Sequence, residues 1–501
     1  MSDANLILIT GALLVAGLLA TVLAGRLRVP GLVLFLGLGM AIGSDGTGWI
    51  DFADYELART IGVIALALIL FEGGLAVGFS EVRPVLGASV ALAILGTMLT
   101  AAIAGLAASW LFGFSVLEGM LVGSIVSATD GAAIFGLLRD SSLRPRIART
   151  LEGEAGVNDP IAVLLVVGLI DWIELPDYGL GDMVLLFVQE LGIGLAVGIA
   201  VGWIAVQGLR RASLGGESGY AIGTIGAAAV AFGAASSLHG SGFLAVYLAG
   251  LFLGTVPIPA KRAVTLFHQG LAQVSQVAMF VVLGLLVFPS QLGDVALEGT
   301  LLALVLMLVA RPAATLLATL PFGFTFREKS VLAWAGLRGA IPVVLATFPV
   351  IEGVPESLDF FNIVFFAVLL STLLQGATFE PFAKALGVTS DPEPAPGAAP
   401  LPRPPSPSSQ ILTVRPWADG DGDPGFPRDV LGIEVTRHLL SRLDRPGALV
   451  SLADGRYAFT GPLLGVGSAS ALQAAARRRL AGSRSDAEQS WWREVIGALA
   501  R

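Results

Sequence analysis

LEGEAGVNDPIAVLLV, residues 151–166, carries three carboxylates, Glu152, Glu154 and Asp159, in a strongly apolar region of the chain. Long apolar runs precede and follow this stretch, and most of the sequence before residue 390 has the composition of protein that is soluble in hydrocarbon. These carboxylates therefore have no obvious water-facing surface. Ionisable groups at membrane depth are energetically costly, which makes them candidates for an ion or proton path.

The composition indicates a polytopic membrane protein rather than a globular enzyme. Of 501 residues, 55% are hydrophobic and only 14% are charged,. The sequence has no cysteine, which excludes disulfides, thiolate chemistry and cysteine-based metal sites, and its three histidines are too scattered for a zinc site,. The N-terminus, MSDANLILIT, lacks a basic region before its apolar part, so we interpret it as a first membrane helix rather than a cleaved signal peptide,.

Apolar runs predict the number of membrane spans. A spanning helix needs about 20 mostly apolar residues. The sequence contains thirteen candidates, at residues 4–24, 29–44, 58–77, 84–112, 116–138, 149–171, 181–208, 217–237, 241–255, 266–288, 295–320, 330–350 and 358–386. The second and ninth are short.

Charge in the loops supports this count and predicts an orientation. With the N-terminus outside, the inward loops carry the basic residues Arg26, Arg28, Arg83, Arg139, Arg144, Arg146, Arg149, Arg210, Arg211, Lys261, Arg262, Arg327, Lys329 and Lys384. The outward loops are acidic, and Arg59 is their one basic residue. The positive-inside rule then predicts a cytoplasmic C-terminal tail.

Two candidate spans are interrupted near the middle of the membrane. The fifth contains SATDGAA (127–133) and the twelfth contains GLRGAIP (336–342). Thirteen helices divide as six, one and six, so the broken helix is the fifth member of each half. Paired interruptions at matching positions indicate an inverted repeat with a binding site at the midplane. Glycine and proline are common in membrane helices, but each break also carries a charge, Asp130 or Arg338,.

The composition predicts three parts: a transmembrane domain (1–388), a proline-rich linker (389–409) and a cytoplasmic domain (410–501),. In the tail, Asp454 and Gly455 lie between two β-prone runs, which predicts a hairpin, and residues 472–480 and 487–499 predict helices,. The sequence thus predicts an all-α membrane protein with a small α+β tail. The tail is either a regulatory module or a stabilising cap or membrane-surface anchor.

Asp159 is the strongest candidate for a transport site. An aspartate within a membrane helix needs a partner, which is a proton, a cation or a fixed positive charge. One titrating carboxylate binds either one proton or one monovalent cation, which predicts one-for-one, electrically silent exchange. Asn158 beside it offers a carbonyl oxygen and cannot titrate,. The alternative is that Asn158 and Asp159 cap a helix that starts at Pro160.

Thr129 and Asp130 lie in the first interruption, where unwound backbone offers carbonyl oxygens to hard cations,. We favour an electrostatic role for Asp130, which would neutralise the positive N-terminal ends of the facing half-helices rather than bind the ion.

Glu154 and Arg338 are expected to form a structural ion pair, because each is otherwise an unpaired charge at membrane depth,. Arg338 has Asp130 and Asp159 as alternative partners. Glu72 lies either in the cation path, in the inner funnel or, by snorkelling, at the interface, and we expect Arg311 to snorkel,.

Four motifs resemble the NhaP-like branch of the monovalent cation/proton antiporters, and most closely its potassium/proton members, the cell-volume regulation proteins. The motifs are SATDGAAIFGLLR (127–139), LEGEAGVNDPIAVLL (151–165), LFEGGL (70–75) and WAGLRGAIPVVLATFP (334–349), and the likeness covers about residues 5–386. The resemblance implies a thirteen-helix inverted repeat with two crossed discontinuous helices, a homodimer, alternating access by an elevator-like movement, and a location in the bacterial inner membrane.

The resemblance also implies residue roles. Asp159 would bind the ion and the proton, Asn158 would be the neighbour typical of electroneutral members, Thr129 would offer a backbone ligand, and Glu154 with Arg338 would form the structural bridge. The chain departs from the family by having Ala155 and Val157 where members often have serine. A ligand hydroxyl is thereby lost, and a looser, water-filled site would suit potassium.

The sequence therefore predicts secondary transport, in which cytoplasmic potassium, or alternatively sodium, leaves as protons enter. A cation channel is the alternative from another class, but the sequence has no repeated filter motif,. An intramembrane enzyme would need a nucleophile–base pair or a histidine-rich metal site, and neither is present in the sequence,. We expect no cofactor beyond the transported ions and no nucleic-acid partner.

Overall fold

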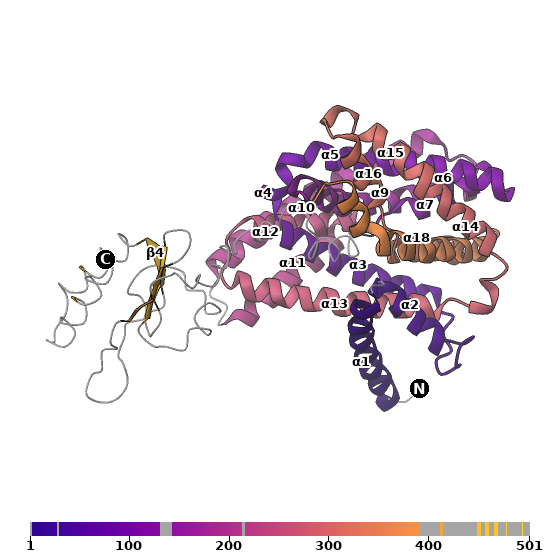
Figure 1. Ribbon diagram of the computed structural model, residues 1–501. Coiled ribbons are helices and arrows are strands. Elements are labelled where there is room, and N and C mark those ends of the chain that lie inside the picture. The colour runs from indigo at the N-terminus through magenta and orange to yellow at the C-terminus, as the bar shows by residue number, and fades with distance from the viewer. Residues whose placement is uncertain are drawn as a thin grey trace. The chain divides into compact units, whose positions relative to one another are not determined.

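The computed structural model describes residues 3–27, 30–130, 143–212 and 216–389, and in the C-terminal part residues 411–413, 448–451, 456–459, 465–468, 477 and 493. The chain divides into two compact units, Met1–Pro392 and Glu393–Arg501. The first is built from long helices, with α1 (Asp3–Leu27) extending from the others at the N-terminus (Figure 1). The described part of the second forms a small antiparallel sheet.

The described helices match the predicted spans closely. Eight helical segments are long and apolar enough to cross a membrane: α3 (Tyr55–Val77), Phe79–Phe112, α9 (Pro145–Glu174), α10 (Leu180–Arg211), α11 (Glu217–Ser237), α13 (Lys261–Leu285), Ala296–Ala318 and α18 (Ser357–Ala385). Shorter apolar helices are the Gly11–Ala24 part of α1, α2 (Gly31–Ile42), α7 (Val116–Ser127), α12 (Gly242–Thr255) and α17 (Ala340–Glu352). This confirms the expected all-α membrane architecture.

Both expected interruptions are observed, and both broken helices begin in the same way. α7 starts with a capping box in which the Ser115 N–H donates to Glu118 (2.8 Å) and the Glu118 N–H donates back to the Ser115 hydroxyl. α16 (Phe326–Trp334) starts with the equivalent pair, Thr325 and Glu328. Such boxes satisfy backbone donors that the first helical turn leaves unpaired. The matching start signals agree with a repeated half.

After these starts the two helices unwind. α7 ends at Ser127, and residues 128–130, the first break, follow in non-helical conformation. The remainder of the fifth candidate span lies outside the described residues. In the twelfth candidate, residues 335–339, the second break, separate α16 from α17.

The fourth and eleventh spans share a second local feature, a π-helical turn. Leu92–Gly96 is π-helical between α5 (Leu86–Ala91) and α6 (Thr97–Phe112). Leu306–Ala310 is π-helical between α14 (Ala296–Val305) and α15 (Arg311–Ala318). α15 packs against the first π turn and α6 against the second. Such turns are rare and often occur at functional sites, and here they lie at corresponding positions of the two halves.

Close glycine packing joins α3 to α12. A Cβ atom added at Gly74 would overlap the backbone of Tyr247, and one added at Gly250 would overlap the backbone of Phe71. The two main chains therefore touch without intervening side chains, as small residues allow in membrane helices.

The tail sheet has the order β1 (Ile411–Thr413), β2 (Ala448–Ser451), β3 (Arg456–Phe459) and β4 (Gly465–Ser468). β2 and β3 pair antiparallel on either side of residues 452–455, as the hairpin signal predicts. The two helices expected in the tail, and almost all of the linker, lie outside the described residues, apart from single positions.

Candidate ion-binding site

The two breaks contact each other directly. The backbone N–H of Asp130 donates to the carbonyl of Leu337 (2.9 Å), and Nη1 of Arg338 donates to the carbonyl of Ser127 (2.7 Å). Ser127 is the last residue of α7, and helix C-termini carry partial negative charge,. The Arg338 guanidinium therefore neutralises that helix end.

Asp130 occupies the opposite electrostatic position. Its carboxylate lies against Gly339, the residue that precedes α17, and a Cβ atom added there would overlap it. Helix N-termini carry partial positive charge, so an anion is stabilised at this point. This location agrees with the neutralising role that we favoured for Asp130.

α9 forms the second wall of the site. It runs unbroken from Pro145 to Glu174 with Pro160 inside it, so Asn158 and Asp159 are interior helical residues. The capping alternative for these two residues is therefore wrong. Since proline has no N–H, Pro160 leaves the carbonyl of Gly156 without its usual helical donor.

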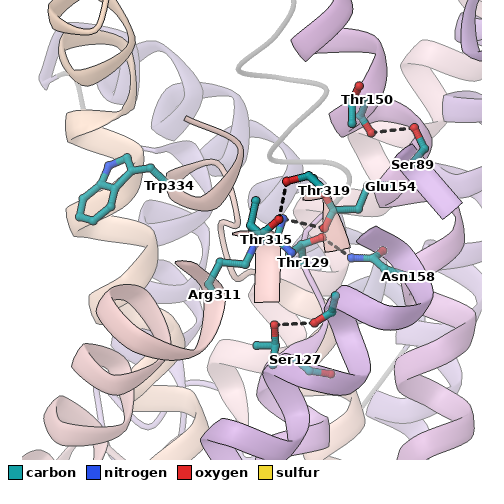
Figure 2. A network of polar contacts seen from close by, with 12 residues as sticks. Ser89, Ser127, Thr129, Thr150, Glu154, Asn158, Arg311, Thr315, Thr319 and Trp334 are labelled. Atoms are coloured by element: carbon teal, nitrogen blue, oxygen red, sulfur yellow. Dashed lines mark hydrogen bonds and ion pairs between the residues drawn. The ribbon is translucent and has the colours of Figure 1, made fainter. Parts of the chain in front are cut away.

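α9 presents two different polar faces. Successive helical residues are about 100° apart, so Glu154 and Asn158 share one face, whereas Glu152, Gly156 and Asp159 share another. Figure 2 shows Glu154 directed toward Arg311 and Asn158 directed toward Thr129. The first face thus ties α9 to neighbouring helices, and the second carries the candidate transport carboxylate.

Asn158 and Thr129 are hydrogen-bonded through the amide Nδ2 and the hydroxyl Oγ1. The amide nitrogen is thereby used, and the carbonyl Oδ1 of Asn158 has no hydrogen-bond partner within the described residues. Both carboxylate oxygens of Asp159 are in the same condition. All three residues are fully buried. A buried carboxylate without donors is costly unless a proton or a cation neutralises it.

The expected pair of Glu154 with Arg338 is wrong, because the structure pairs Glu154 with Arg311 at 2.6 Å. Arg311 is only 1% exposed, so it does not snorkel either. It follows directly on the second π turn, which turns its side chain inward onto α9. Arg338 is occupied with Ser127 but lies close enough to interact electrostatically with both Arg311 and Glu154.

Glu72 is buried on α3, which disfavours the snorkelling alternative. The ring of the preceding Phe71 lies 4.9 Å from that of His268 on α13, and Nε2 of His268 is 2.8 Å from the Thr224 hydroxyl on α11. Phe71 therefore lies where α3 meets α13, and Glu72 is its buried neighbour in the sequence.

Three polar residues of α18 were missed from the sequence. The Gln375 amide donates to the carbonyl of Trp334 (3.1 Å), the Thr372 hydroxyl donates to the carbonyl of Arg338, and the Ser371 hydroxyl donates to Gln375 (2.6 Å). Gln375 and Thr372 satisfy backbone carbonyls at the second break, as buried backbone requires, and Ser371 holds the Gln375 amide,. The signal was the polar run STLLQ (371–375) in an apolar span.

In the part of the chain that the structure describes, the buried charges around the crossing leave one negative charge. Asp130, Glu154 and Asp159 supply three carboxylates, and Arg311 and Arg338 supply two guanidinium groups, all buried. One proton or one monovalent cation neutralises the cluster. Among the described residues, no group of three or more His, Cys, Asp or Glu side chains is placed to chelate a metal ion. The unpartnered oxygens of Asn158 and Asp159 are of the kind that hard cations prefer,.

Comparison with known proteins agrees with this chemistry. The family described as sodium/hydrogen exchanger, transmembrane, matches residues 11–385. The K(+)/H(+) antiporter NhaP2 of Shewanella baltica (strain OS223) is 40% identical over 401 residues, which is 79% of this chain and 69% of that protein. The K(+)/H(+) antiporter NhaP of Alkalimonas amylolytica is 39% identical over 76% of this chain and 66% of its own length.

Two further similarities are more distant. The Na(+)/H(+) antiporter NhaH of Halobacillus aidingensis is 25% identical over 73% of this chain and 94% of that protein. The structure of the sodium proton antiporter MjNhaP1 from Methanocaldococcus jannaschii at pH 8 superposes with a TM-score of 0.67. It covers 77% of this chain and 99% of that chain at 24% identity, and so confirms the fold.

Proposed function

Because the chain belongs to the sodium/hydrogen exchanger family, we propose that it exchanges cytoplasmic potassium for external protons, one for one, at Asp159. It is a monovalent cation/proton antiporter in a membrane that it crosses many times. The exchanged ion, the stoichiometry and the residues that bind the ion are the proposal.

The unpartnered carboxylate of Asp159 is the observation that carries this proposal. It is buried, it has no hydrogen-bond donor within the described residues, and it belongs to a cluster with one surplus negative charge. A proton and an alkali cation each neutralise that charge and therefore exclude one another. Mutual exclusion at one site couples the two ions, and each transport cycle then moves no net charge.

Potassium is proposed over sodium for two reasons. The relatives that are about 40% identical to the chain are named as K(+)/H(+) antiporters. In addition, Ala155, which replaces a serine common in the family, packs in an apolar cluster with Leu151 and Val331. No hydroxyl is present there to replace the tightly held water of a small cation, and this favours the cation that sheds water more readily. Sodium is the alternative.

The orientation is proposed from the charge distribution. Basic residues gather in alternate loops, which supports a bacterial inner-membrane protein with its N-terminus outside and its tail in the cytoplasm,. We also propose the homodimer and elevator-like alternating access that the resemblance implies. In that arrangement Thr129 and Asn158 accompany Asp159 on the moving part, and the ion-binding role of Glu72 stays a prediction.

The test is exchange by everted membrane vesicles from cells that lack other antiporters. A preset pH gradient is followed by fluorescence while KCl, NaCl, RbCl, LiCl or choline chloride is added. The wild type should collapse the gradient with potassium, and imposing a membrane potential should change the rate little. Asp159→Asn should reduce exchange by at least about 100-fold, because the amide cannot titrate and so cannot exchange a proton for the cation.

The matched control is Asp171→Asn, which removes a carboxylate further along α9. It should retain exchange, and both variants should elute as folded protein in size-exclusion chromatography. Full exchange in a folded Asp159→Asn variant would refute the site. A current that follows the potassium gradient without proton movement would instead favour the channel alternative.

A further inference from the structure

A second group of charges lies at the arginine-rich end of α9, apart from the site described above. Arg149 contacts Glu152 through Nη1 (2.8 Å) and Glu81 through Nη2 (3.2 Å). The Glu81 side chain is 40% exposed, Arg149 is 23% exposed and Glu152 is 12% exposed. The single guanidinium group of Arg149 thus pairs with two carboxylates, which leaves this group with one surplus negative charge. Of the two carboxylates, Glu152 is the more deeply buried.

A buried phenol lies about one helical turn from Glu152, on the same face of α9,. Tyr247 of α12 is 2% exposed, and its hydroxyl has no hydrogen-bond partner among the described residues. The hydroxyl-bearing end of its ring lies directly over Gly156, where an added Cβ atom would overlap it. The phenol also lies within electrostatic reach of Glu152. An orphaned buried hydroxyl is uncommon and calls for a ligand or water.

The geometry of α9 links this group to Asp159. Glu152, Gly156 and Asp159 share one helical face, and the two carboxylates are two turns, about 10 Å, apart along the helix. The Tyr247 ring covers the face midway between them. Pro160 leaves the Gly156 carbonyl without its usual donor, so a further oxygen lies on this line,. Oxygen ligands are therefore spaced along the face from the half-exposed end to the buried site.

We propose that the Glu152 carboxylate and the Tyr247 hydroxyl form an outer station that holds a monovalent cation on its way to or from Asp159. The inference rests on the antiport function proposed above. The cation competes with Arg149 for Glu152, and Arg149 keeps its contact with Glu81 when it is displaced. The Tyr247 ring, seated on Gly156, separates the station from the inner site.

A purely structural ion pair between Arg149 and Glu152 is the competing explanation, and the two explanations differ in the sign of their effects. If the pair only stabilises the fold, neutralising either partner lowers stability and leaves cation affinity alone. If Glu152 is a station, neutralising it weakens cation binding, whereas neutralising Arg149 removes a competitor and strengthens it.

The experiment measures the apparent KM and maximal rate in everted vesicles, with KCl and NaCl as probes and choline chloride holding ionic strength constant. Glu152→Gln should raise the KM about 5-fold with at least half of the maximal rate, as expected when one charge-assisted contact is lost. Arg149→Gln should lower the KM about 2-fold, and Tyr247→Phe should raise it about 2-fold. Glu174→Gln, at the other end of α9, is the matched control and should leave the KM unchanged.

The outcomes separate the station from the antiporter itself. If the wild type moves no protons on addition of either cation, the proposed function fails. If the wild type exchanges but Glu152→Gln keeps the wild-type KM, or if both Glu152→Gln and Arg149→Gln shift it in the same direction, the station is overturned. If the KM shift disappears when the choline chloride concentration is raised, the substituted charge acts on the cation only through long-range electrostatics that salt screens. That result also overturns the station. Opposite shifts that persist would establish it.

Discussion

The two breaks contact each other but have different surroundings. Around the first break, the neighbours are Arg338 on Ser127, Asn158 on Thr129, and the Asp130 carboxylate at the start of α17. Around the second break, neutral side chains of α18 cover the carbonyls of Trp334 and Arg338, and the Arg311 side chain lies against Gly336. The first break therefore contacts Asn158, the residue beside Asp159, whereas neutral donors of α18 satisfy the carbonyls of Trp334 and Arg338 at the second break.

This difference suggests that the first break takes part in ion binding, whereas the second break has a structural role. Unwound backbone is tolerated at membrane depth only where its polar groups find partners. Neutral hydroxyl and amide donors provide such partners without regard to pH or to the bound ion. The hydrogen bond between Thr129 and Asn158, by contrast, lies next to the candidate transport carboxylate in the sequence. Substitutions beside the two breaks should accordingly differ in kind, and the predictions below are ordered from the largest expected effect to the smallest.

Arg311→Met should have the largest effect, because it leaves Glu154 buried without its partner. Removing one member of a buried ion pair costs about 3–5 kcal/mol in the free energy of unfolding. The loss should appear as a lower midpoint in thermal unfolding of the purified protein, followed by tryptophan fluorescence in detergent.

The double variant Arg311→Met with Glu154→Gln is the matched control. Replacing both charges removes the unpaired carboxylate, so much of the lost stability should return. A double variant as unstable as Arg311→Met alone would contradict the pairing. The pairing would also be contradicted if Glu154→Gln restored more stability to Arg338→Met than to Arg311→Met.

The most direct comparison makes one substitution at both breaks. Thr129→Val removes the hydroxyl that accepts from Asn158, and Thr372→Val removes the hydroxyl that donates to the Arg338 carbonyl. Each should cost about 1 kcal/mol of stability, the typical net value of a hydrogen bond. Only Thr129→Val should change the KM for the cation, because it frees the Asn158 amide beside Asp159. Equal KM values in the two variants would show that the breaks do not differ in role.

The smallest effect is expected outside both breaks. Asp45, in the exposed segment between α2 and α3, accepts a hydrogen bond from the Ser290 N–H (2.7 Å), and this bond lowers the pKa of Asp45 below its usual 3.8. A lowered pKa contributes stability above about pH 4 that is lost as the pH falls through the folded-state value. Asp45→Asn should therefore lower the thermal midpoint slightly at neutral pH, and the difference from wild type should shrink in acid. A difference that grows in acid would contradict this assignment.

Much of the membrane architecture could be predicted because it depends on one-dimensional signals. Apolar length located the spans, loop charge supported their count, and paired interruptions located both breaks. The phase of α9 was also available, since Glu154 with Asn158 and Glu152 with Asp159 separate by simple helical spacing.

The partner of Glu154 could not be predicted, because it depends on how helices rotate against one another. Arg311 reaches Glu154 after a π turn, which shifts helical phase and has no clear sequence signal,. The role of Gln375 was missed for a related reason, since a single amide in an apolar span does not reveal which carbonyl it satisfies. The homodimer, the orientation and the ion preference stay predictions.

The glycine contact between α3 and α12 has a mechanical consequence. Where the two main chains touch at Gly74 and Gly250, no side chains lie between them, so α3 and α12 should move together as one rigid unit. Glu72 belongs to α3 and Tyr247 belongs to α12, so both residues are part of that unit. The close contact therefore fixes the spacing between the two helices that carry Glu72 and Tyr247, and a methyl group added at either glycine would push the two main chains apart.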